Sequence, residues 1–376
     1  MNTPKIDRNQ SAGETQSPLE WAEKACDALM AKFEPEQLPP NYFHYHQGVF
    51  LSGMEQCWRL SGKEKYYDYL KRWVDSQITE EGVVKKFHEE ELDDIQPGIL
   101  LFNLYERTGD DRYKKALHQL VPLIKPWPTN SVGGFWHKGH FPNQMWLDGL
   151  YMGGPIAVRF GRTFGDGDYF DLIARQAVLM ADHMKDPDTG LLYHAWDITK
   201  EAEWADPVTG LSPEFWGRSI GWFPVALLDI LEYLPEDHSQ RSRLIEILRD
   251  LLIALSKFQD ERTGLWYQVV DKGGRPDNWL ESSCSALYTQ AIARAVRLGY
   301  LDEKYMQTAW KGYDGSIAAL KFDPDTGNVI IGNVCVGTNV GDYTFYVNRP
   351  TSENDLHGAG AFILMCTELS QASPRA

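Results

Sequence analysis

The chain has 376 residues, 43% of them hydrophobic, so it is long enough to bury a sizeable core. Its formal net charge of -16 argues against nucleic acid as a partner, because phosphate binding needs a basic surface. The five cysteines form no CxxC pair, and no segment has the composition of a signal peptide or a membrane span, so we expect a cytoplasmic protein without a membrane partner.

In chain order, we expect a flexible N-terminal tail over residues 1–16 and a single domain over residues 17–376. Within that domain, apolar residues recur at three- and four-residue spacing in successive stretches, which is typical of helices. The stretches predict six helical hairpins: 18–32 with 45–61, 63–78 with 94–108, 110–122 with 145–161, 165–184 with 216–233, 238–259 with 281–299, and 301–320 with 354–368.

Several turns between the hairpins share one pattern, in which a glycine follows the end of a helix and a charged turn leads to a tyrosine in the next helix. The glycines are Gly62, Gly109, Gly165 and Gly299. Glycine accepts the left-handed backbone that commonly ends a helix. The second helix of each hairpin is richer in small, aliphatic and aromatic residues, as expected for a helix surrounded by protein. Six inner and six outer helices predict an all-α fold, an (α/α)6 barrel.

The connections from each outer helix to its inner helix are long. Loops of this length in a compact domain are usually functional, and all would emerge at the end of the barrel where the inner helices begin. Several contain the pattern Asp-x-x-Thr-Gly followed by alternating residues, which predicts short β-hairpins. We expect the aspartates of this pattern to form turns and not to be catalytic: Asp186, Asp206, Asp260 and Asp323.

Polar and aromatic residues gather in these loops and at the starts of the inner helices. One of Asp93 and Asp94 could instead cap a helix, Arg218 could hold a loop by a salt bridge, and the tryptophans could pack at the barrel rim. The full set is Tyr45, His46, Asp93, Asp94, Trp136, His137, Lys138, His140, Trp146, Asp148, His194, Trp196, Trp216, Arg218, Trp222 and His357.

Asp148 has the strongest case for catalysis. It follows Trp146 and precedes Gly153 and Gly154, which remove side chains near the start of the inner helix and leave space over the barrel axis. Desolvation next to such a space should raise the pKa of the carboxyl group. A raised pKa would make Asp148 a usable acid near neutral pH.

No convincing set of metal ligands is visible. The segments HEEE at His88 and WHKGH at His137 lack partner residues at metal-ligand spacing. The chain also lacks a Walker loop, a Rossmann fingerprint and a GxSxG motif. We therefore expect no metal and no cofactor, and chemistry that depends on side chains alone.

The segment MWLDGLYMGGP, residues 145–155, together with LDDIQPG, YHAWD and FWGRSIGWF, resembles the unsaturated rhamnogalacturonyl hydrolases of glycoside hydrolase family 105. These are related to the unsaturated glucuronyl hydrolases of family 88. The resemblance covers nearly the whole chain and implies an (α/α)6 barrel. It also implies an enzyme of pectin degradation that releases Δ4,5-unsaturated galacturonic acid from the non-reducing end of fragments left by lyases.

The resemblance further implies that the enzyme hydrates the C4=C5 double bond. An aspartate protonates C4, water adds at C5, and the resulting hemiketal opens and breaks the glycosidic bond. Asp148 matches this acid, which can then act as base. Asp93 would orient sugar hydroxyls, with Asp94 as an open alternative, and His194 would hold the attacking water or the ring oxygen.

The remaining residues would bind substrate. Arg218, helped by Lys138, would bind the uronate carboxylate, because a guanidinium matches carboxylate geometry. Tryptophans would stack on the sugar planes, and two further residues would line the pocket: Trp146, Trp216 and Trp222, then Tyr45 and His137.

Two other activities stay open. One is an unsaturated glucuronyl hydrolase acting on other lyase-generated uronides, and the other is an inverting glycosidase that uses Asp94 and Asp148 as its two carboxylates. In each case we expect a small oligosaccharide as the partner. We also expect a monomer.

Overall fold

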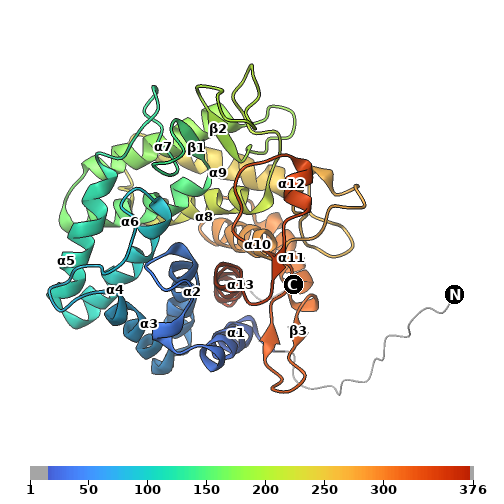
Figure 1. Cartoon of the computed structure of the whole chain (residues 1–376). Coiled ribbons are helices and arrows are strands. Elements are labelled where there is room, and N and C mark those ends of the chain that lie inside the picture. The colour runs from blue at the N-terminus through green and yellow to red at the C-terminus, as the bar shows by residue number, and fades with distance from the viewer. Residues whose placement is uncertain (1–15, 373–376) are drawn as a thin grey trace, which may run out of the picture.

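In the computed structural model, which describes residues 16–372, twelve long helices form an inner and an outer ring (Figure 1). The inner ring consists of α2 (Tyr45–Ser61), α4 (Ile99–Thr108), α6 (Asp148–Phe164), α8 (Gly217–Tyr233), α10 (Ser282–Arg297) and α13 (Leu356–Leu369). The outer ring consists of α1 (Pro18–Lys32), α3 (Glu64–Gln77), α5 (Asp111–Leu120), α7 (Asp168–Met184), α9 (Arg241–Ser256) and α11 (Met306–Ala318). The predicted (α/α)6 barrel is confirmed. The expected tail, apart from Gln16, and residues 373–376 lie outside the described residues.

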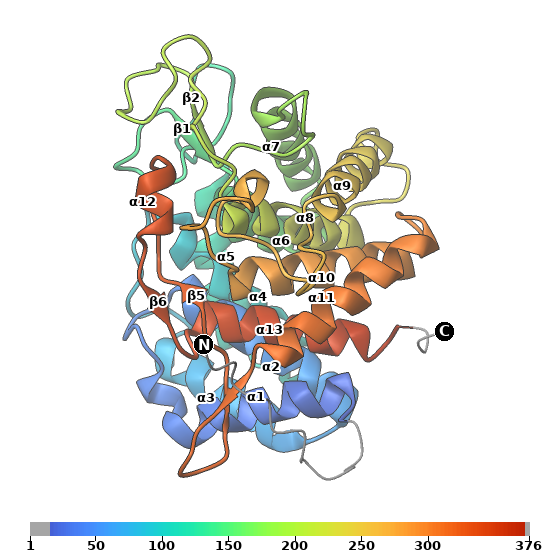
Figure 2. The ribbon, with the colours of Figure 1, turned by 90° about the vertical axis from the view of Figure 1, so that its right-hand side faces the viewer.

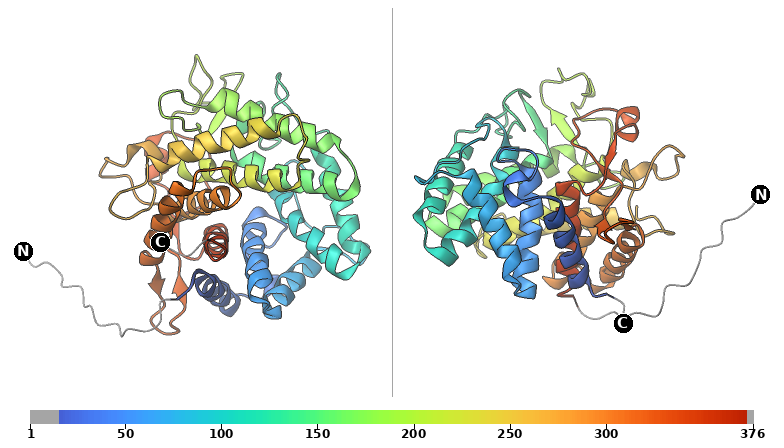
Figure 3. Two further views of the ribbon diagram at one scale, coloured as in Figure 1. Left: turned by 180° about the vertical axis from the view of Figure 1, so that it is seen from behind. Right: turned by 60° about the horizontal axis from the view of Figure 1, so that its bottom comes forward.

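The ring closes between the two ends of the chain. Neighbouring inner helices pack together in the sequence α6, α8, α10, α13 and α2, and the last inner helix, α13, also contacts the first outer helix, α1. Seen from behind, α13 in dark red lies beside α1 in dark blue (Figure 3). Segments more than 300 residues apart in sequence therefore share one part of the core.

The two rings differ in burial as their compositions predict. In α6 and α8 almost every residue is buried; α6 contains four glycines, and α8 contains two glycines and three leucines. In α3 and α5 only one face is buried, including Tyr66, Leu70 and Trp73 of α3, and the other face is charged. An outer helix needs only one apolar stripe, whereas an inner helix is covered on all sides.

The predicted turn glycines adopt left-handed backbone conformations, with φ of 68° at Gly62 and 77° at Gly165. The turn aspartates are also confirmed. In each Asp-x-x-Thr-Gly segment, the aspartate accepts hydrogen bonds from the backbone and hydroxyl of the threonine: Asp186 from Thr189, Asp206 from Thr209, Asp260 from Thr263, and Asp323 from Thr326.

The long loops contain short elements at one end of the barrel. The strands are β1 (Gln144–Trp146), β2 (Ala195–Asp197), β3 (Lys321–Phe322), β4 (Val329–Ile330), β5 (Val334–Cys335) and β6 (Thr351–Ser352), which pair antiparallel as β1–β2, β3–β4 and β5–β6. The loops also contain α12 (Tyr343–Val347) and short 3₁₀ helices: η1 (Pro35–Gln37), η2 (Leu92–Asp94), η3 (Gln96–Gly98), η4 (Val121–Ile124) and η5 (Val270–Lys272). A sixth 3₁₀ helix, η6 (Glu303–Tyr305), lies in the short turn between α10 and α11. Figure 2 shows β1, β2, β5, β6 and α12 gathered on the side away from the C-terminus.

The prediction that the third inner helix begins at residue 145 is wrong, because residues 144–146 form β1. Met145 is paired with Trp196 and Trp146 with Ala195, and the helix begins only at Asp148. This pairing joins two of the long loops across 50 residues of sequence, which local periodicity does not detect.

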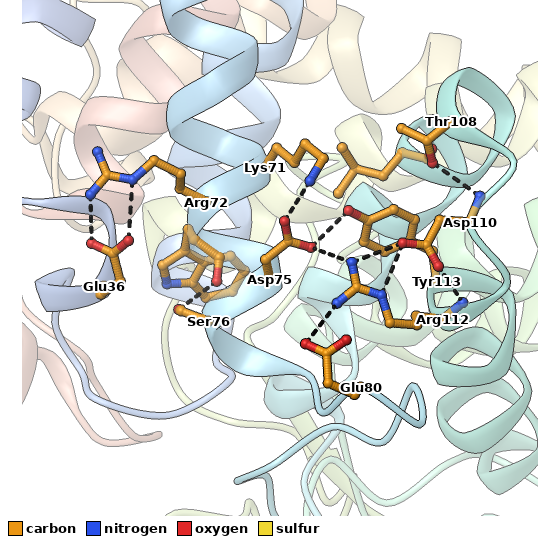
Figure 4. A network of polar contacts seen from close by, with 12 residues as sticks. Glu36, Lys71, Arg72, Asp75, Ser76, Glu80, Thr108, Asp110, Arg112 and Tyr113 are labelled. Carbon is orange, nitrogen blue, oxygen red and sulfur yellow. Dashed lines mark hydrogen bonds and ion pairs between the residues drawn. The ribbon is translucent and has the colours of Figure 1, made fainter.

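Outer helices are linked by polar contacts at the surface. Figure 4 shows Asp75 of α3 between Lys71 of its own helix and Arg112 and Tyr113 of α5. Within residues 16–372, none of the helices combines the length and the apolar character needed to cross a lipid bilayer.

Candidate active site

The sequence-predicted site residues meet at the end of the barrel where the inner helices begin. Tyr45 opens α2, Asp93 lies in η2 just before α4, Asp148 opens α6, and Arg218 lies in the first turn of α8. His194 directly precedes β2. The fold therefore brings to one end of the molecule side chains that lie up to 173 residues apart in sequence.

The pairing of β1 with β2 places His194 next to Asp148. The backbone N–H of Leu147 donates to the carbonyl of His194 at 3.1 Å, so the residue before the aspartate lies directly beside the histidine. His194 Nε2 lies 3.3 Å from Asp148 Oδ2. Both atoms are buried; the hydrogen bond between them is poorly aligned, and neither has another partner among the described residues. Such a pair can bind a water molecule or a substrate hydroxyl that contacts both members.

Asp148 is 9% exposed, so it is shielded but still reaches solvent. The expectation of a raised pKa is wrong for the free protein. Desolvation does raise the pKa of Asp148, but the hydrogen bond and charge of His194 and the charges of His137 and Arg218 outweigh it, and the net pKa is lowered. Asp148 is therefore a carboxylate before substrate arrives.

Asp93 belongs to the same group of side chains as Asp148. Its Oδ2 lies 2.8 Å from Lys138 Nζ and its Oδ1 lies 3.9 Å from His137 Nε2. Desolvation raises the pKa of Asp93, but the Lys138 ammonium, with His137 and His44, lowers it to about 2. Burial lowers the pKa of His137, against the opposite effects of Asp93 and Asp148, so this imidazole is close enough to interact with both carboxylates.

Asp94 faces a different partner. Its Oδ2 accepts a hydrogen bond from the His88 backbone at 2.7 Å and lies 2.7 Å from His88 Nδ1. Desolvation, partly offset by these contacts with His88, raises the pKa of Asp94 to about 7. The His88 side chain is 62% exposed, whereas the Asp94 side chain is fully buried. The geometry thus separates the two neighbouring carboxylates and leaves Asp93 on the side of His137.

Arg218 is buried at 1% exposure and has no carboxylate within ion-pair distance in the described part of the chain. Its Nη1 donates to the Cys335 carbonyl at 2.5 Å and its Nη2 to the Val336 carbonyl at 2.9 Å, and its guanidinium stacks on Trp216. The alternative of a loop-holding salt bridge is therefore replaced by hydrogen bonds to backbone carbonyls. These bonds leave the positive charge without a counter-ion.

The aromatic residues are more buried than their predicted role requires. Trp216 and Trp222 are each 1% exposed, with Trp216 stacked parallel to Tyr346 and Trp222 on Tyr151. Neither presents an open ring face for a sugar in this structure, so both are packing residues behind the site. Trp146 is also buried, with its ring stacked near His137 and Phe141.

Sequence reasoning missed Tyr346, which lies in α12 of the loop 321–353. Its hydroxyl lies 2.7 Å from His194 Nδ1, on the side of the imidazole opposite Asp148. The length of its loop was a signal that something functional lies there, but no motif pointed to this tyrosine. His44, whose pKa burial lowers to about 4, was missed as well, although it belongs to the segment that contains Tyr45.

Two groups of side chains in the described residues have the composition of metal ligands. One is His46, Asp355 and His357, and the other is His88, Glu91 and Asp94. In the first group, Asp355 Oδ1 lies 2.8 Å from His357 Nδ1, and burial and the charges of His357, His46 and Arg218 act on Asp355 with a net lowering of its pKa. An anion held by surrounding positive and imidazole groups accounts for this arrangement without a metal ion.

A cavity of about 550 Å³ lies inside the ring of inner helices, lined mainly by residues from the middle and C-terminal parts of these helices. Its lining carboxylates are paired with arginines: Glu55 with Arg59, Asp229 and Glu232 with Arg294, and Glu368 with Arg297. None of the predicted site residues lines this cavity. Its lining also includes buried polar atoms without a hydrogen-bond partner among the described residues, on Ser52, Gln96, Arg159 and Gln290.

A helical barrel with carboxylates, imidazoles and an unpaired guanidinium at its loop end is an arrangement found in glycoside hydrolases. The sequence profile described as Glycosyl Hydrolase Family 88 matches residues 21–373, and the chain belongs to this family. A solved glycoside hydrolase of family 105 from C. acetobutylicum ATCC 824 is 35% identical and superposes with a TM-score of 0.88, covering 93% of this chain and 98% of that one.

Curated relatives agree with this membership. The unsaturated rhamnogalacturonyl hydrolase YesR of Bacillus subtilis (strain 168) is 32% identical over 266 residues, which is 69% of this chain and 72% of the relative. An unsaturated 3S-rhamnoglycuronyl hydrolase of Alteromonas sp. (strain LOR) is 26% identical over 333 residues, 81% of this chain and 76% of that relative. The protein is thus a glycoside hydrolase of the family 88 and 105 group.

Proposed function

We propose that this enzyme releases Δ4,5-unsaturated galacturonic acid from the non-reducing end of unsaturated rhamnogalacturonan oligosaccharides. Arg218 carries the proposal, because it is a buried cation without a counter-ion in an acidic protein. A buried unpaired charge is costly unless a ligand of opposite charge completes it. The carboxylate of a uronic acid is such a ligand, and the Bacillus subtilis relative is named for this activity.

Asp148 is the proposed acid in the first step, donating a proton to C4 of the double bond. In the free protein its pKa is lowered by several groups, Arg218 among them. A uronate bound to Arg218 offsets that positive charge with a negative one, and this change raises the pKa of Asp148. Asp148 then takes up a proton from solvent, and this is the proton that the reaction transfers to C4.

The second step adds water to C5. Asp148, now a carboxylate again, accepts a proton from the water, and the imidazole of His194 at 3.3 Å orients that water. The product hemiketal opens and the glycosidic bond breaks. Atoms balance because the proton gained at C4 and the hydroxyl gained at C5 together make one water molecule.

Asp93 is the proposed second carboxylate of the pocket, and it binds sugar hydroxyls. Lys138 is held by Asp93 and Glu91, so its part is to keep Asp93 ionised and oriented. Tyr45, His137 and Trp146 are proposed to line the pocket. His137 lies 3.9 Å from Asp93, the Trp146 ring stacks on His137, and Tyr45 contacts Trp222 edge-on. The tryptophans 216 and 222 support Arg218 and Tyr45 from behind.

A second candidate is a hydrolase of other lyase-generated uronides, with the same chemistry and a different neighbouring sugar. The relative from Alteromonas favours it, because its name specifies a sulfated rhamnose next to the uronic acid. The inverting glycosidase that would use Asp94 finds no support, because Asp94 faces His88. We further propose that the enzyme works as a monomer in the cytoplasm, within pectin degradation.

The test is a discontinuous assay of the purified protein with lyase-digested rhamnogalacturonan, following the loss of ultraviolet absorbance of the double bond. The matched control is Asp148→Asn. Unsaturated oligosaccharides that carry a sulfated rhamnose, or that derive from glycosaminoglycans, test the second candidate. In deuterium oxide the product should carry deuterium on C4, because hydration forms a new carbon–hydrogen bond. Cleavage without deuterium on carbon, or cleavage of saturated oligosaccharides alone, would contradict the proposal.

A further inference from the structure

We propose that Tyr346 is a positioning residue that fixes the tautomer of His194, so that the imidazole presents an N–H to Asp148. The inference rests on the proposed function, in which His194 and Asp148 act together on water. It concerns a residue 152 positions from His194 in sequence that contacts Asp148 only through the histidine.

The tyrosine hydroxyl has two neighbours in the described residues. The backbone N–H of Gly341 donates to Tyr346 Oη at 3.1 Å, and His194 Nδ1 lies 2.7 Å from the same oxygen. An amide N–H is only a donor, so the Gly341 contact uses Oη as an acceptor. The hydroxyl hydrogen is then directed to the other neighbour, His194 Nδ1.

The direction of this hydroxyl hydrogen determines the tautomer of His194. A neutral imidazole carries one N–H and one lone pair, and a nitrogen that accepts from tyrosine must hold the lone pair. Nδ1 is therefore the acceptor, and the single N–H is on Nε2, which faces Asp148 Oδ2 at 3.3 Å. In the other tautomer an Nε2 lone pair would face the carboxylate, which is repulsive.

Tyr346 is held firmly enough to impose this choice. It is fully buried, its carbonyl accepts from Gln268 Nε2 at 3.1 Å, and its ring lies parallel to Trp216. The helix that carries it, α12, is capped by Asp342, whose side chain accepts from the Phe345 backbone at 2.7 Å. The long loop 321–353 thus delivers one hydroxyl group to the back of the catalytic histidine.

The direct test is nitrogen NMR of protein with isotopically labelled histidine, near neutral pH and without substrate. The His194 signals are assigned by their disappearance in His194→Gln. We expect the Nδ1 signal of wild-type His194 to be that of a hydrogen-bond acceptor and its proton to lie on Nε2, and Tyr346→Phe to show both tautomers. A wild-type His194 that is protonated on Nδ1 would overturn the proposal without any variant.

Kinetics give a second test. Tyr346→Phe should lower kcat on the order of tenfold, the effect of losing one orienting hydrogen bond, with KM changed by less than about twofold. In His194→Gln the amide N–H occupies the place of Nε2–H and has no tautomers. In that background Tyr346→Phe should cost less than about twofold, and an undiminished loss would mean that Tyr346 is only structural.

The matched control is Tyr343→Phe, which removes the hydroxyl of a tyrosine in the same helix. That hydroxyl donates to Asp277 Oδ1 at 2.7 Å, outside the site. It should leave kcat and the His194 spectrum unchanged. The spectrum needs no substrate, so a His194 proton found on Nδ1 overturns this inference alone. A wild-type protein that leaves rhamnogalacturonan fragments intact overturns the proposed function and not the tautomer.

Discussion

Asp148 combines a lowered pKa with the proposed role of a proton donor, and the charge of a bound substrate would reconcile the two. Burial alone would raise its pKa, but His194, His137 and Arg218 lower it in the free protein. A donor must be protonated, so activity falls as pH rises above the pKa of Asp148 in the relevant state. That pKa is low in the free enzyme, and we expect it to be higher in the complex with a bound uronate.

The pH profiles of kcat and kcat/KM of the wild type should therefore differ. Because kcat/KM reports the free enzyme and kcat reports the complex, the fall in kcat on the alkaline side should lie at higher pH than the fall in kcat/KM. Asp148→Asn should lose about 10²- to 10⁴-fold in kcat at every pH while retaining the circular dichroism of the wild type. A rate that rises with pH would instead indicate a base-first reaction.

Arg218 gives a prediction about binding. Arg218→Lys keeps the charge but loses the two-pronged geometry and the bonds to the Cys335 and Val336 carbonyls, so KM for the unsaturated uronate should rise about tenfold or more. The measurement compares the free acid with its methyl ester. Wild type should prefer the acid, and the variant should lose most of this preference, whereas equal losses on both substrates would place the carboxylate elsewhere.

At the residue level, the sequence predicted which types of side chain meet but not their orientation. Asp148, His194 and Arg218 follow motifs that could be recognised, and the fold gathers them at one end. The expectation that Trp216 and Trp222 stack on sugar rings is not supported, because neighbouring rings cover both side chains. Tyr346 could not be predicted, because its contact with His194 depends on how a loop folds back over the barrel. Neither helical periodicity nor a turn pattern predicts the course of that loop.

At the level of elements, helix periodicity located all twelve barrel helices. The errors are at their starts. The second inner helix was expected from residue 94, but Pro97 lies in η3 and the helix begins at Ile99. The fifth outer helix was expected from residue 238 and begins at Arg241, after a turn. Apolar residues continue through these segments, so the pattern alone does not show where hydrogen bonding changes from turn to helix.

The polar contacts of the outer helices differ in strength. Helix α3 makes both a buried contact and an exposed one, so the two can be compared. Asp75 accepts from the hydroxyl of buried Tyr113 at 2.8 Å and contacts Arg112 on α5 (Figure 4). Asp75→Ala should lower the free energy of unfolding by about 1–3 kcal/mol, because it leaves the tyrosine hydroxyl without an acceptor. Urea denaturation followed by circular dichroism measures this change.

The control is Arg72→Ala on the same helix. Arg72 is 55% exposed in its side chain and pairs with Glu34 and Glu36 in solvent. Exposed pairs of this kind contribute little, so the urea midpoint should stay where it is in the wild type. Alanine has the highest helix propensity, so neither substitution weakens α3 by that route. If both variants lowered the midpoint equally, the contact with α5 would not be the cause.

At the level of the whole molecule, the barrel depends on closing a ring between α2 and α13, which come from opposite ends of the chain. The two helices approach closely at Gly360, where an added Cβ would lie 2.6 Å from the backbone of Val49 and Phe50. Gly53 of α2 lies against the carbonyl of Gly360 in the same crossing. Small residues on both helices thus permit a contact that larger side chains would prevent.

Gly360→Ala should therefore destabilise the whole barrel, and not one hairpin, because the clash is with backbone that cannot move without opening the ring. Overpacking of this kind typically costs about 1–3 kcal/mol. The expected result is one cooperative urea transition at a lower midpoint, seen equally by far-ultraviolet circular dichroism and by tryptophan fluorescence. Gly274→Ala is the control, since a Cβ there meets no atom within 4 Å and its backbone is not left-handed. A Gly360→Ala midpoint equal to that control would mean that α2 and α13 can separate without cost, and that the ring is held closed by its other contacts.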